Sequence, residues 1–479
     1  MLKKFMKDSV IYAFPTFISG GLGFFLLPLY TRILSPADYG SLDLLTIFGG
    51  MVSVVIALEI SQAVARFFTG ELDPVRKVLI ASSAFWFTLA CYSLFALLML
   101  LNTNPLANLI MGAAGMEDAF QIGIIYIWSN GLFYLIQNQF RWELRSINYA
   151  IVSLFMSFVT ALVSVWLAYV MEWGLEGILT GMVFGSLAGT SLGIWWLRKS
   201  IRFCFDSSLL QEMLLFSIPL VFSSLTVWLS TYIDRIMINH YLSVDELGLY
   251  SIGLRIALVG GLLIVGFRGA ITPLIYMYYR EEQTPHHLAN IFRLFVFCVL
   301  IVFLVLSLFA IDIVKLLTTE AFYGSSVVVV YLVPAVLLTN MYIFAPGAGI
   351  AKKTHYFIWI NLAGALLNLF LNILLIPPLG IVGAALATFI SSIVLFAMYM
   401  IVSQKLYYVP HYWLSISLGI FIAFFIAWAI PQLLVNDVVR WVINLSSLLS
   451  MVLISFVIGL IKVKELRQAL VIIKKSIVS

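Results

Sequence analysis

The chain has 479 residues, of which 63% are hydrophobic and only 10% are charged, and its mean hydropathy is +1.08. About a quarter of the residues of a soluble domain carry charge, so this composition excludes a soluble enzyme or soluble binding module of this size. The net charge of +5 would suggest nucleic acid as a partner of a soluble protein, but in so apolar a chain it reflects membrane topology.

Apolar runs of about 20 residues, the length that crosses the hydrocarbon core, recur from end to end. They predict an all-α polytopic membrane protein with about fourteen transmembrane helices. The first run, from Ser9, is too long for the core of a signal peptide and is expected to span the membrane. In chain order the predicted spans are 9–33, 40–68, 78–101, 120–140, 148–170, 175–197, 212–241, 247–275, 290–311, 326–349, 356–376, 380–402, 412–430 and 439–461. The longest predicted connections are Asn102–Asp118 and Asp312–Ser325.

Lysines and arginines gather at alternate ends of these spans. If the N-terminal lysines are cytoplasmic, most of the 27 basic residues lie at cytoplasmic ends. The exceptions are Arg32, Arg235, Lys315 and Arg440 at the opposite ends, and Arg255 and Arg268 inside the eighth span. This split predicts an even number of spans, with the N- and C-termini in the cytoplasm.

Three short segments recur in the same order at nearly one offset. RILSPADYG (Arg32–Gly40) matches HYLSVDELG (His240–Gly248), INYA (from Ile147) matches THYF (from Thr354), and GLEGILTGM (from Gly174) matches GIVGAALAT (from Gly380). The offsets of 208, 207 and 206 predict two six-helix lobes in parallel repeat, at 1–202 and 203–405. An extra helix pair and a cytoplasmic tail would follow at 406–479. Two such lobes favour a cleft between them and transport by rocking of the lobes.

The same motifs resemble a known family. LSPADYG, the start of the second lobe at Phe216 (FSIPLVFSSL), and the G-x-x-G-A-A-x-A-T segment ending at Thr388 resemble the Wzx-type flippases of O-antigen and capsule oligosaccharides. The resemblance covers about the whole chain and extends to the multidrug/oligosaccharidyl-lipid/polysaccharide exporter superfamily. It implies that an undecaprenyl-pyrophosphate-linked oligosaccharide is flipped to the outer leaflet of a bacterial inner membrane by alternating access. The context would be O-antigen and lipopolysaccharide synthesis, beside other polysaccharide-assembly membrane proteins.

Ionisable residues inside membrane spans usually face a cavity or a partner. Span eight lines the cleft in the resembling family, so Arg255 and Arg268 are candidates for binding the pyrophosphate through guanidinium forks. The repeat places Arg268 beside the position of Glu59 in the other lobe. The two either pair across the cleft when no anionic head group is bound, or each faces its own lobe. Asp43 and Arg66 complete the candidate substrate set, since Arg66 follows Glu59 by seven residues and is expected on the same helix face.

The resemblance to lipid II flippases also implies a sodium site. Its matching positions here are Asp234 on span seven, Asn368 and Asn372 on span eleven, Thr388 on span twelve, and the carbonyl of Ala384. Asn372 departs from the resembling site, where an aspartate is expected. Hydrogen bonding between the asparagines and a proton carried by Asp234 are alternatives, so the coupling ion is Na⁺ or H⁺.

Arg235 follows Asp234 directly, and the two side chains leave a helix about 100° apart. We therefore expect Arg235 at the outward mouth or the membrane interface rather than beside Asp234.

The remaining classes of function are disfavoured. The cysteines are far apart, which predicts neither a disulfide nor a metal site. A multidrug exporter of the same superfamily would want unpaired carboxylates for cationic drugs, whereas span eight offers arginines. A membrane-embedded glycan polymerase or ligase usually needs a long outward loop with catalytic Arg or His, and no outward loop exceeds about twenty residues. With no nucleotide-binding motif, we expect no direct use of ATP. We also expect no enzyme activity, no organic cofactor and no nucleic-acid partner.

Overall fold

The computed structural model describes residues 2–112, 115–353, 355–432 and 436–462, leaving out the side chains of most of residues 2–20 and of 263, 265–270 and 272–274. Every described element is a helix, which confirms the all-α prediction. Eleven helices of the described part are long and apolar enough to cross a membrane, or twelve if one bent pair is counted as a span. The protein is therefore a multi-pass membrane protein. The first and eighth predicted spans fall on α1 (Leu2–Ile33) and α10 (Val244–Tyr278), where many side chains lie outside the described residues, so the count of about fourteen stays a prediction.

Packing divides the chain into two compact units, residues 1–251 with 317–321 (unit 1) and residues 252–316 with 322–479 (unit 2). The first boundary differs from the one at 202 predicted from the repeat. The reason is α9 (Ser207–Tyr241), which packs along α2, α3 and α4 of unit 1. The predicted lobes follow the sequence repeat, whereas the units follow packing, and the lobe boundaries stay a prediction.

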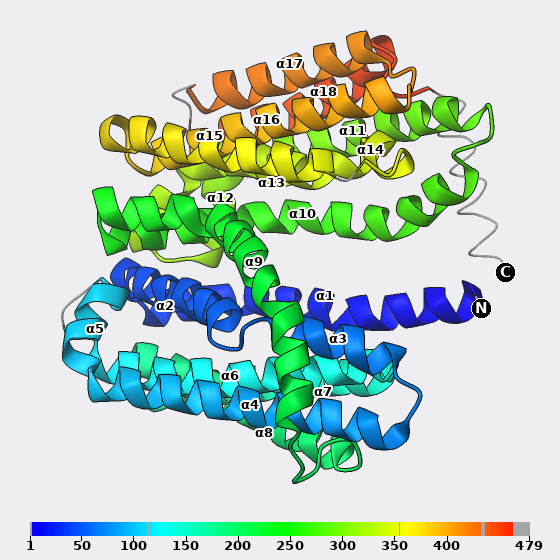
Figure 1. Ribbon diagram of the computed structural model, residues 1–479. Coiled ribbons are helices and arrows are strands. Elements are labelled where there is room, and N and C mark those ends of the chain that lie inside the picture. The colour runs from blue at the N-terminus through cyan, green and yellow to red at the C-terminus, as the bar shows by residue number, and fades with distance from the viewer. Residues whose placement is uncertain (1, 113–114, 354, 433–435, 463–479) are drawn as a thin grey trace, which may run out of the picture. The chain divides into compact units, whose positions relative to one another are not determined.

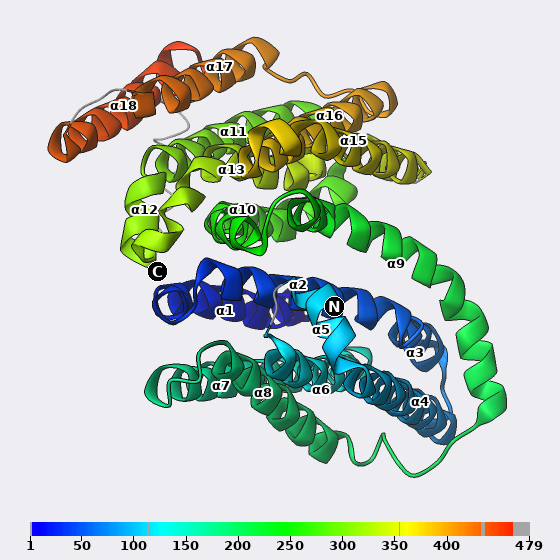
Figure 2. The same cartoon turned by 90° about the vertical axis from the view of Figure 1, so that its left-hand side faces the viewer.

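Unit 1 is built on helices that run side by side. In Figure 1, α4, α6, α7 and α8 form one group, in which α8 packs against both α6 and α7. The helix α9 curves along its length (Figure 2) and contains Pro219, which removes one backbone hydrogen-bond donor. The bounds are α2 Pro36–Val55, α3 Ile60–Gly70, α4 Pro74–Leu101, α5 Thr103–Met111, α6 Glu117–Trp142, α7 Ser146–Val165 with a π-helical turn at Trp166–Val170, and α8 Gly174–Leu197.

The second predicted span, 40–68, is broken in the structure. The helices α2 and α3 meet at an angle of 47°. At the break, Leu58 and Glu59 have φ of 49° and 53°, in the left-handed region that costs non-glycine residues about 1–2 kcal/mol each. The predicted span 40–68 is therefore built from two helices rather than one, and no glycine or proline in the sequence marks the break. Strained residues of this kind cluster at functional sites.

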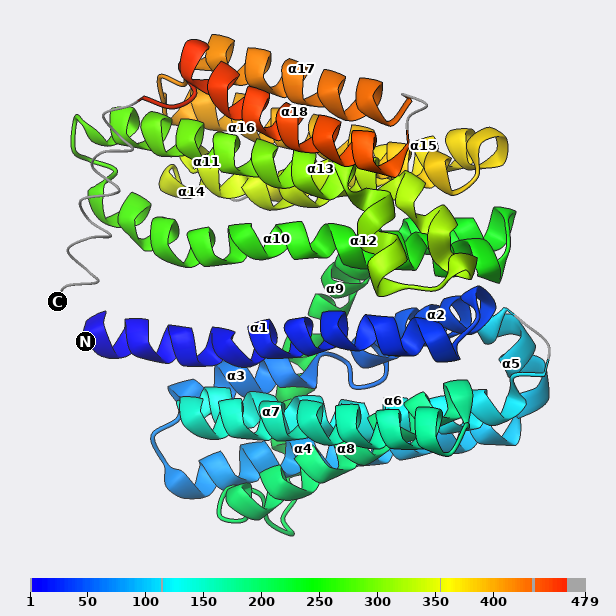
Figure 3. The same ribbon diagram turned by 180° about the vertical axis from the view of Figure 1, so that it is seen from behind.

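Unit 2 contains the rest of α10 and the helices that follow it, with α17 and α18 running side by side (Figure 3). The bounds are α11 Thr284–Leu308, α12 Ala310–Leu317, α13 Ser326–Asn340, α14 Gly347–Ile350, α15 His355–Leu379, α16 Ile381–Leu406, α17 Trp413–Ala429 and α18 Asp437–Val457, with 3-10 turns at Glu320–Ser325, Met341–Phe344 and Ile430–Gln432. Both long predicted connections are partly helical, because α5 lies in the first and α12 in the second.

A buried arginine ties the C-terminal helix pair to α11. The fully buried Arg293 donates a hydrogen bond of 2.8 Å to the carbonyl of Gly459, after α18, and its guanidinium lies 4.8 Å from the ring centre of Tyr412, before α17. The neighbouring His411 packs on Phe292. Burial lowers the pKa of His411 to about 4, so the ring is neutral at physiological pH and adds no charge here.

The third pair of repeated segments has the same local structure in both copies. Gly174 and Gly380, at the starts of α8 and α16, have φ of 55° and 60°, which glycine adopts without strain. Three residues later, a Cβ on Gly177 would overlap the backbone of Ala168, and a Cβ on Gly383 would overlap the carbonyl of Leu375. In each copy, glycine lets one helix turn back closely against the helix before it.

We therefore expect Gly383→Ala to lower the free energy of unfolding by about 1–3 kcal/mol, because the backbone it meets cannot give way cheaply. The matched control is Gly70→Ala in α3, where a Cβ would meet nothing within 4 Å. That control removes a helical glycine and should be neutral or stabilising by up to about 1 kcal/mol. The measurement is the thermal unfolding midpoint of both variants in one detergent. Equal unfolding midpoints would show that the close approach of Gly383 to Leu375 does not contribute to stability.

Candidate functional site

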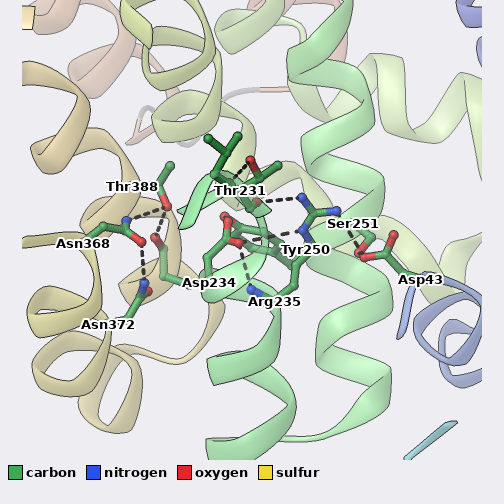
Figure 4. Close-up of polar contacts among 11 residues, drawn as sticks. Asp43, Thr231, Asp234, Arg235, Tyr250, Ser251, Asn368, Asn372 and Thr388 are labelled. Atoms are coloured by element: carbon green, nitrogen blue, oxygen red, sulfur yellow. Dashed lines mark hydrogen bonds and ion pairs between the residues drawn. The ribbon is translucent and has the colours of Figure 1, made fainter. Parts of the chain in front are cut away.

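A buried charged cluster joins α2, α9 and α10 within unit 1 (Figure 4). Asp43 of α2 and Asp234 of α9 are 8% and 7% exposed. The guanidinium of Arg235, 13% exposed, lies 3.6 Å from Oδ2 of Asp43 and 3.7 Å from Oδ1 of Asp234. Because carboxylates and guanidinium are costly to bury alone, each depends on the others for neutralisation.

Hydrogen bonds from α10 complete this cluster. The hydroxyl of Tyr250 donates to Oδ2 of Asp234, and Oγ of Ser251 donates to Oδ2 of Asp43 at 2.8 Å. Arg235 itself donates to the carbonyl of Thr231 at 3.1 Å. We call Asp43, Asp234, Arg235, Tyr250 and Ser251 the charged cluster.

The prediction that Arg235 does not lie beside Asp234 is wrong, whereas its place near the outward mouth stays a prediction. Its backbone N–H donates to Oδ1 of Asp234 at 2.9 Å, and its side chain curls back to the same oxygen. The 100° between neighbouring helix positions fixes only where a side chain begins, and arginine is long enough to return. Sequence reasoning also missed Tyr250 and Ser251. A signal existed for Ser251, because it lies 208 residues after Asp43, the offset of the repeat.

A second polar cluster joins α15 and α16 within unit 2 (Figure 4). Asn372 donates to Oδ1 of Asn368 at 3.0 Å, and Asn368 donates to Oγ1 of Thr388 at 3.4 Å. Thr388 in turn donates to the carbonyl of Ala384 at 3.0 Å. Asn372 is fully buried, and among the described residues its Oδ1 has no hydrogen-bond donor.

This asparagine cluster fits part of a hard-cation site. Such ions prefer several oxygen ligands, and the unpaired Asn372 Oδ1 is an acceptor with unused capacity. The predicted carboxylate, Asp234, belongs to unit 1, where Tyr250 and Arg235 already occupy its oxygens. The predicted site of Asp234, Asn368, Asn372 and Thr388 therefore stays a prediction, with Asn368, Asn372, Thr388 and Ala384 in contact with one another.

Two of the other candidate substrate residues, Glu59 and Arg66, make none of the hydrogen bonds or ion pairs described for these clusters. Glu59 occupies the left-handed break before α3 and interacts electrostatically with Tyr92 and Tyr134. Arg66 is exposed. Since Glu59 is not helical, a spacing of seven no longer places it on the face of Arg66, which corrects that prediction.

The two arginines of span eight differ in what is described. Arg255 is partly buried and makes interactions of its own. The side chain of Arg268, and with it the proposed Glu59–Arg268 pair, lies outside the described residues.

Known proteins resemble this chain in sequence and in fold. The model of a family described as polysaccharide biosynthesis protein matches residues 29–327. Lsg locus protein 1 of Haemophilus influenzae is 25% identical over 406 residues, which cover 80% of this chain and 95% of that protein. The lipid II flippase MurJ, in an inward closed conformation, superposes with a TM-score of 0.71 at 16% identity, over 93% of this chain and 99% of that one. An inward-facing multidrug transporter of the MATE family superposes with a TM-score of 0.61 at 16% identity, over 83% and 98%.

The chain thus has the fold of MurJ and of a MATE transporter, in a multi-pass membrane protein. Because the family model covers more than half of its length, the chain belongs to the polysaccharide biosynthesis protein family. The resemblance inferred from the repeated motifs is thereby confirmed at the level of the family.

Proposed function

We propose that the protein flips an undecaprenyl-pyrophosphate-linked oligosaccharide from the cytoplasmic to the outer leaflet of a bacterial inner membrane. Two lobes would give access to the cargo alternately, and an ion gradient would drive the cycle as in an antiporter. The cargo would serve the synthesis of a surface glycan such as O-antigen or lipopolysaccharide.

The observation that carries this proposal is the match to a polysaccharide biosynthesis family in a chain with the fold of a lipid II flippase. A flippase within glycan synthesis needs a cargo that joins a sugar to a membrane lipid, which is the chemistry of a lipid-linked oligosaccharide. Two arginines of α10, Arg255 and Arg268, support a pyrophosphate head group as the cargo. Guanidinium groups bind phosphate oxygens through paired, charge-assisted hydrogen bonds.

For the coupling ion, we propose the asparagine cluster as the place where Na⁺ would bind. The oxygens of Asn368, Asn372, Thr388 and Ala384 would hold it, and a bound cation would supply the charge that links cargo movement to the ion gradient. The unpaired Oδ1 of Asn372 supports this assignment over a purely structural role, because a buried acceptor without a donor costs about 1–3 kcal/mol.

Export of lipid II or of a drug is the alternative that the shared fold with MurJ and with a MATE transporter favours. Deletion of the gene in its own host separates the three. The proposal predicts that lipid-linked oligosaccharide accumulates on the cytoplasmic leaflet and that the surface glycan is lost, with drug resistance unchanged. Accumulation of lipid II, or drug sensitivity with normal surface glycan, would instead support one of the alternatives.

A further inference from the structure

The two repeats begin their second helices with a serine cap. Ser35 precedes α2 and accepts a hydrogen bond of 3.1 Å from the N–H of Asp38, whose carboxylate accepts one of 2.9 Å from the N–H of Ser35. Ser243 precedes α10 and accepts a hydrogen bond of 3.3 Å from the N–H of Glu246. Ser243 follows Ser35, and Glu246 follows Asp38, by the repeat offset of 208. RILSPADYG and HYLSVDELG therefore start equivalent helices.

Just inside these caps, α2 and α10 touch through equivalent residues. A Cβ on Gly40 would overlap the carbonyl oxygen of Val244, and a Cβ on Gly248 would overlap that of Pro36. Pro36 corresponds to Val244, and Gly40 to Gly248, at the same offset. The contact is therefore made once in each direction, as at an isologous interface, and the crossing point is a local two-fold axis.

The next residue on this face is Asp43 in α2 and its equivalent Ser251 in α10, which are hydrogen-bonded at 2.8 Å. The positions repeat the i, i+4, i+7 spacing of one helix face, as Pro36, Gly40 and Asp43 in α2 and as Val244, Gly248 and Ser251 in α10. Symmetry ends here, because only one of the two positions is acidic. Arg235, from the end of α9, balances Asp43 and also contacts Asp234.

A permanent joint would be at least as stable with apolar residues as with buried charges. Charges that are paired when dry and hydrated when apart suit a surface that opens to water during a cycle. We call the contact of Pro36 and Gly40 with Val244 and Gly248 the glycine seam, to which the two glycines bring no side chain.

We propose that this seam and the charged cluster form the outward gate of the transporter, with Asp43–Arg235 as its latch. The distribution of basic residues predicts that these helix ends face outward. All the residues of the gate lie in unit 1, where they are in contact with one another. The inference rests on the proposed transport function and adds the residues that seal one side of it.

The first test measures water access. Leu247→Cys, at a position that is 0% exposed in α10, reports the seam by its reaction with a membrane-impermeant maleimide from outside, after the native cysteines are replaced by serine. Asp43→Asn weakens the latch, and Gly40→Val pushes the seam apart. Each should speed labelling by about tenfold or more, a shift in the gate equilibrium. Gly70→Val, in open space, is the control and should leave the rate unchanged.

The second test fixes the seam. In the same background, Asp43→Cys with Ser251→Cys should form a disulfide on oxidation, with flipping lost in the oxidised form and recovered when that protein is reduced. Oxidised protein that flips the cargo as fast as the same protein after reduction would overturn the proposed gate. Unchanged labelling of folded Asp43→Asn and Gly40→Val proteins would also overturn the gate. This result tests the gate even if the reduced double-cysteine protein does not flip the cargo. Labelling needs no cargo, so a wrong cargo would leave the access result intact, whereas a wrong gate would leave flipping of the wild type intact.

Discussion

Replacing Arg235 by alanine is expected to lower the free energy of unfolding by about 3–5 kcal/mol, because it leaves two buried carboxylates without their shared cation. The hydroxyls of Tyr250 and Ser251 would remain as donors but carry no charge. If the loss of the cation opens the gate to water rather than unfolding the protein, the effect would appear as faster labelling of Leu247→Cys. The measurement is the thermal unfolding midpoint together with that labelling rate.

The control for Arg235→Ala is Arg76→Ala. The Arg76–Glu71 pair is 3.3 Å apart, but the Arg76 side chain is 53% exposed, and an exposed pair contributes only about 0–1 kcal/mol. Adding Asp43→Asn and Asp234→Asn to Arg235→Ala removes the uncompensated charges and should recover much of the stability. An Arg235→Ala protein that melts and labels like Arg76→Ala would contradict the account of the charged cluster.

Substitutions of Asn372 are expected to change how flipping depends on sodium. Asn372→Asp places a carboxylate at the oxygen that has no donor, so the sodium concentration for half-maximal flipping should fall about tenfold if the asparagine cluster binds the ion. Asn372→Ala removes that oxygen and should abolish stimulation by sodium. The measurement is the flipping rate against sodium concentration at fixed pH.

A purely structural role of Asn372 gives the opposite pattern. An added carboxylate at a fully buried position would then only destabilise the protein, and neither variant would alter the sodium dependence. Asn361→Ala is the matched control, because this residue lies on the same helix and pairs with Tyr399 rather than with the cluster. A proton gradient that alone drives wild-type flipping would also rule out sodium coupling at Asn372.

Much of the architecture could be predicted because the hydrocarbon core imposes length and polarity on every span. Composition gave the all-α membrane class, and the repeated motifs led to the family that the comparisons confirm. Asp43 and Ser251 are separated by the repeat offset of 208, but this pairing was not predicted from the sequence, and the contact between them comes from the structure.

What could not be predicted depends on long-range packing. Nothing in the sequence around Ala57–Ile60 marks a helix break, so local helix propensity could not predict the left-handed conformation of Leu58 and Glu59. The packing of α9 on α2, α3 and α4 decides that Arg235 meets Asp43. Position on a helix also says little about where a long arginine side chain ends.

The most direct test of the central claim is flipping by the purified protein in vesicles that carry a labelled undecaprenyl-pyrophosphate oligosaccharide. With an imposed sodium or proton gradient, the account predicts that the labelled glycan crosses to the other leaflet, where an impermeant reagent modifies it, and that the oxidised Asp43→Cys/Ser251→Cys protein stops this transfer. Transfer no faster than in protein-free vesicles under either gradient would contradict the claim that the protein is a lipid-linked oligosaccharide flippase.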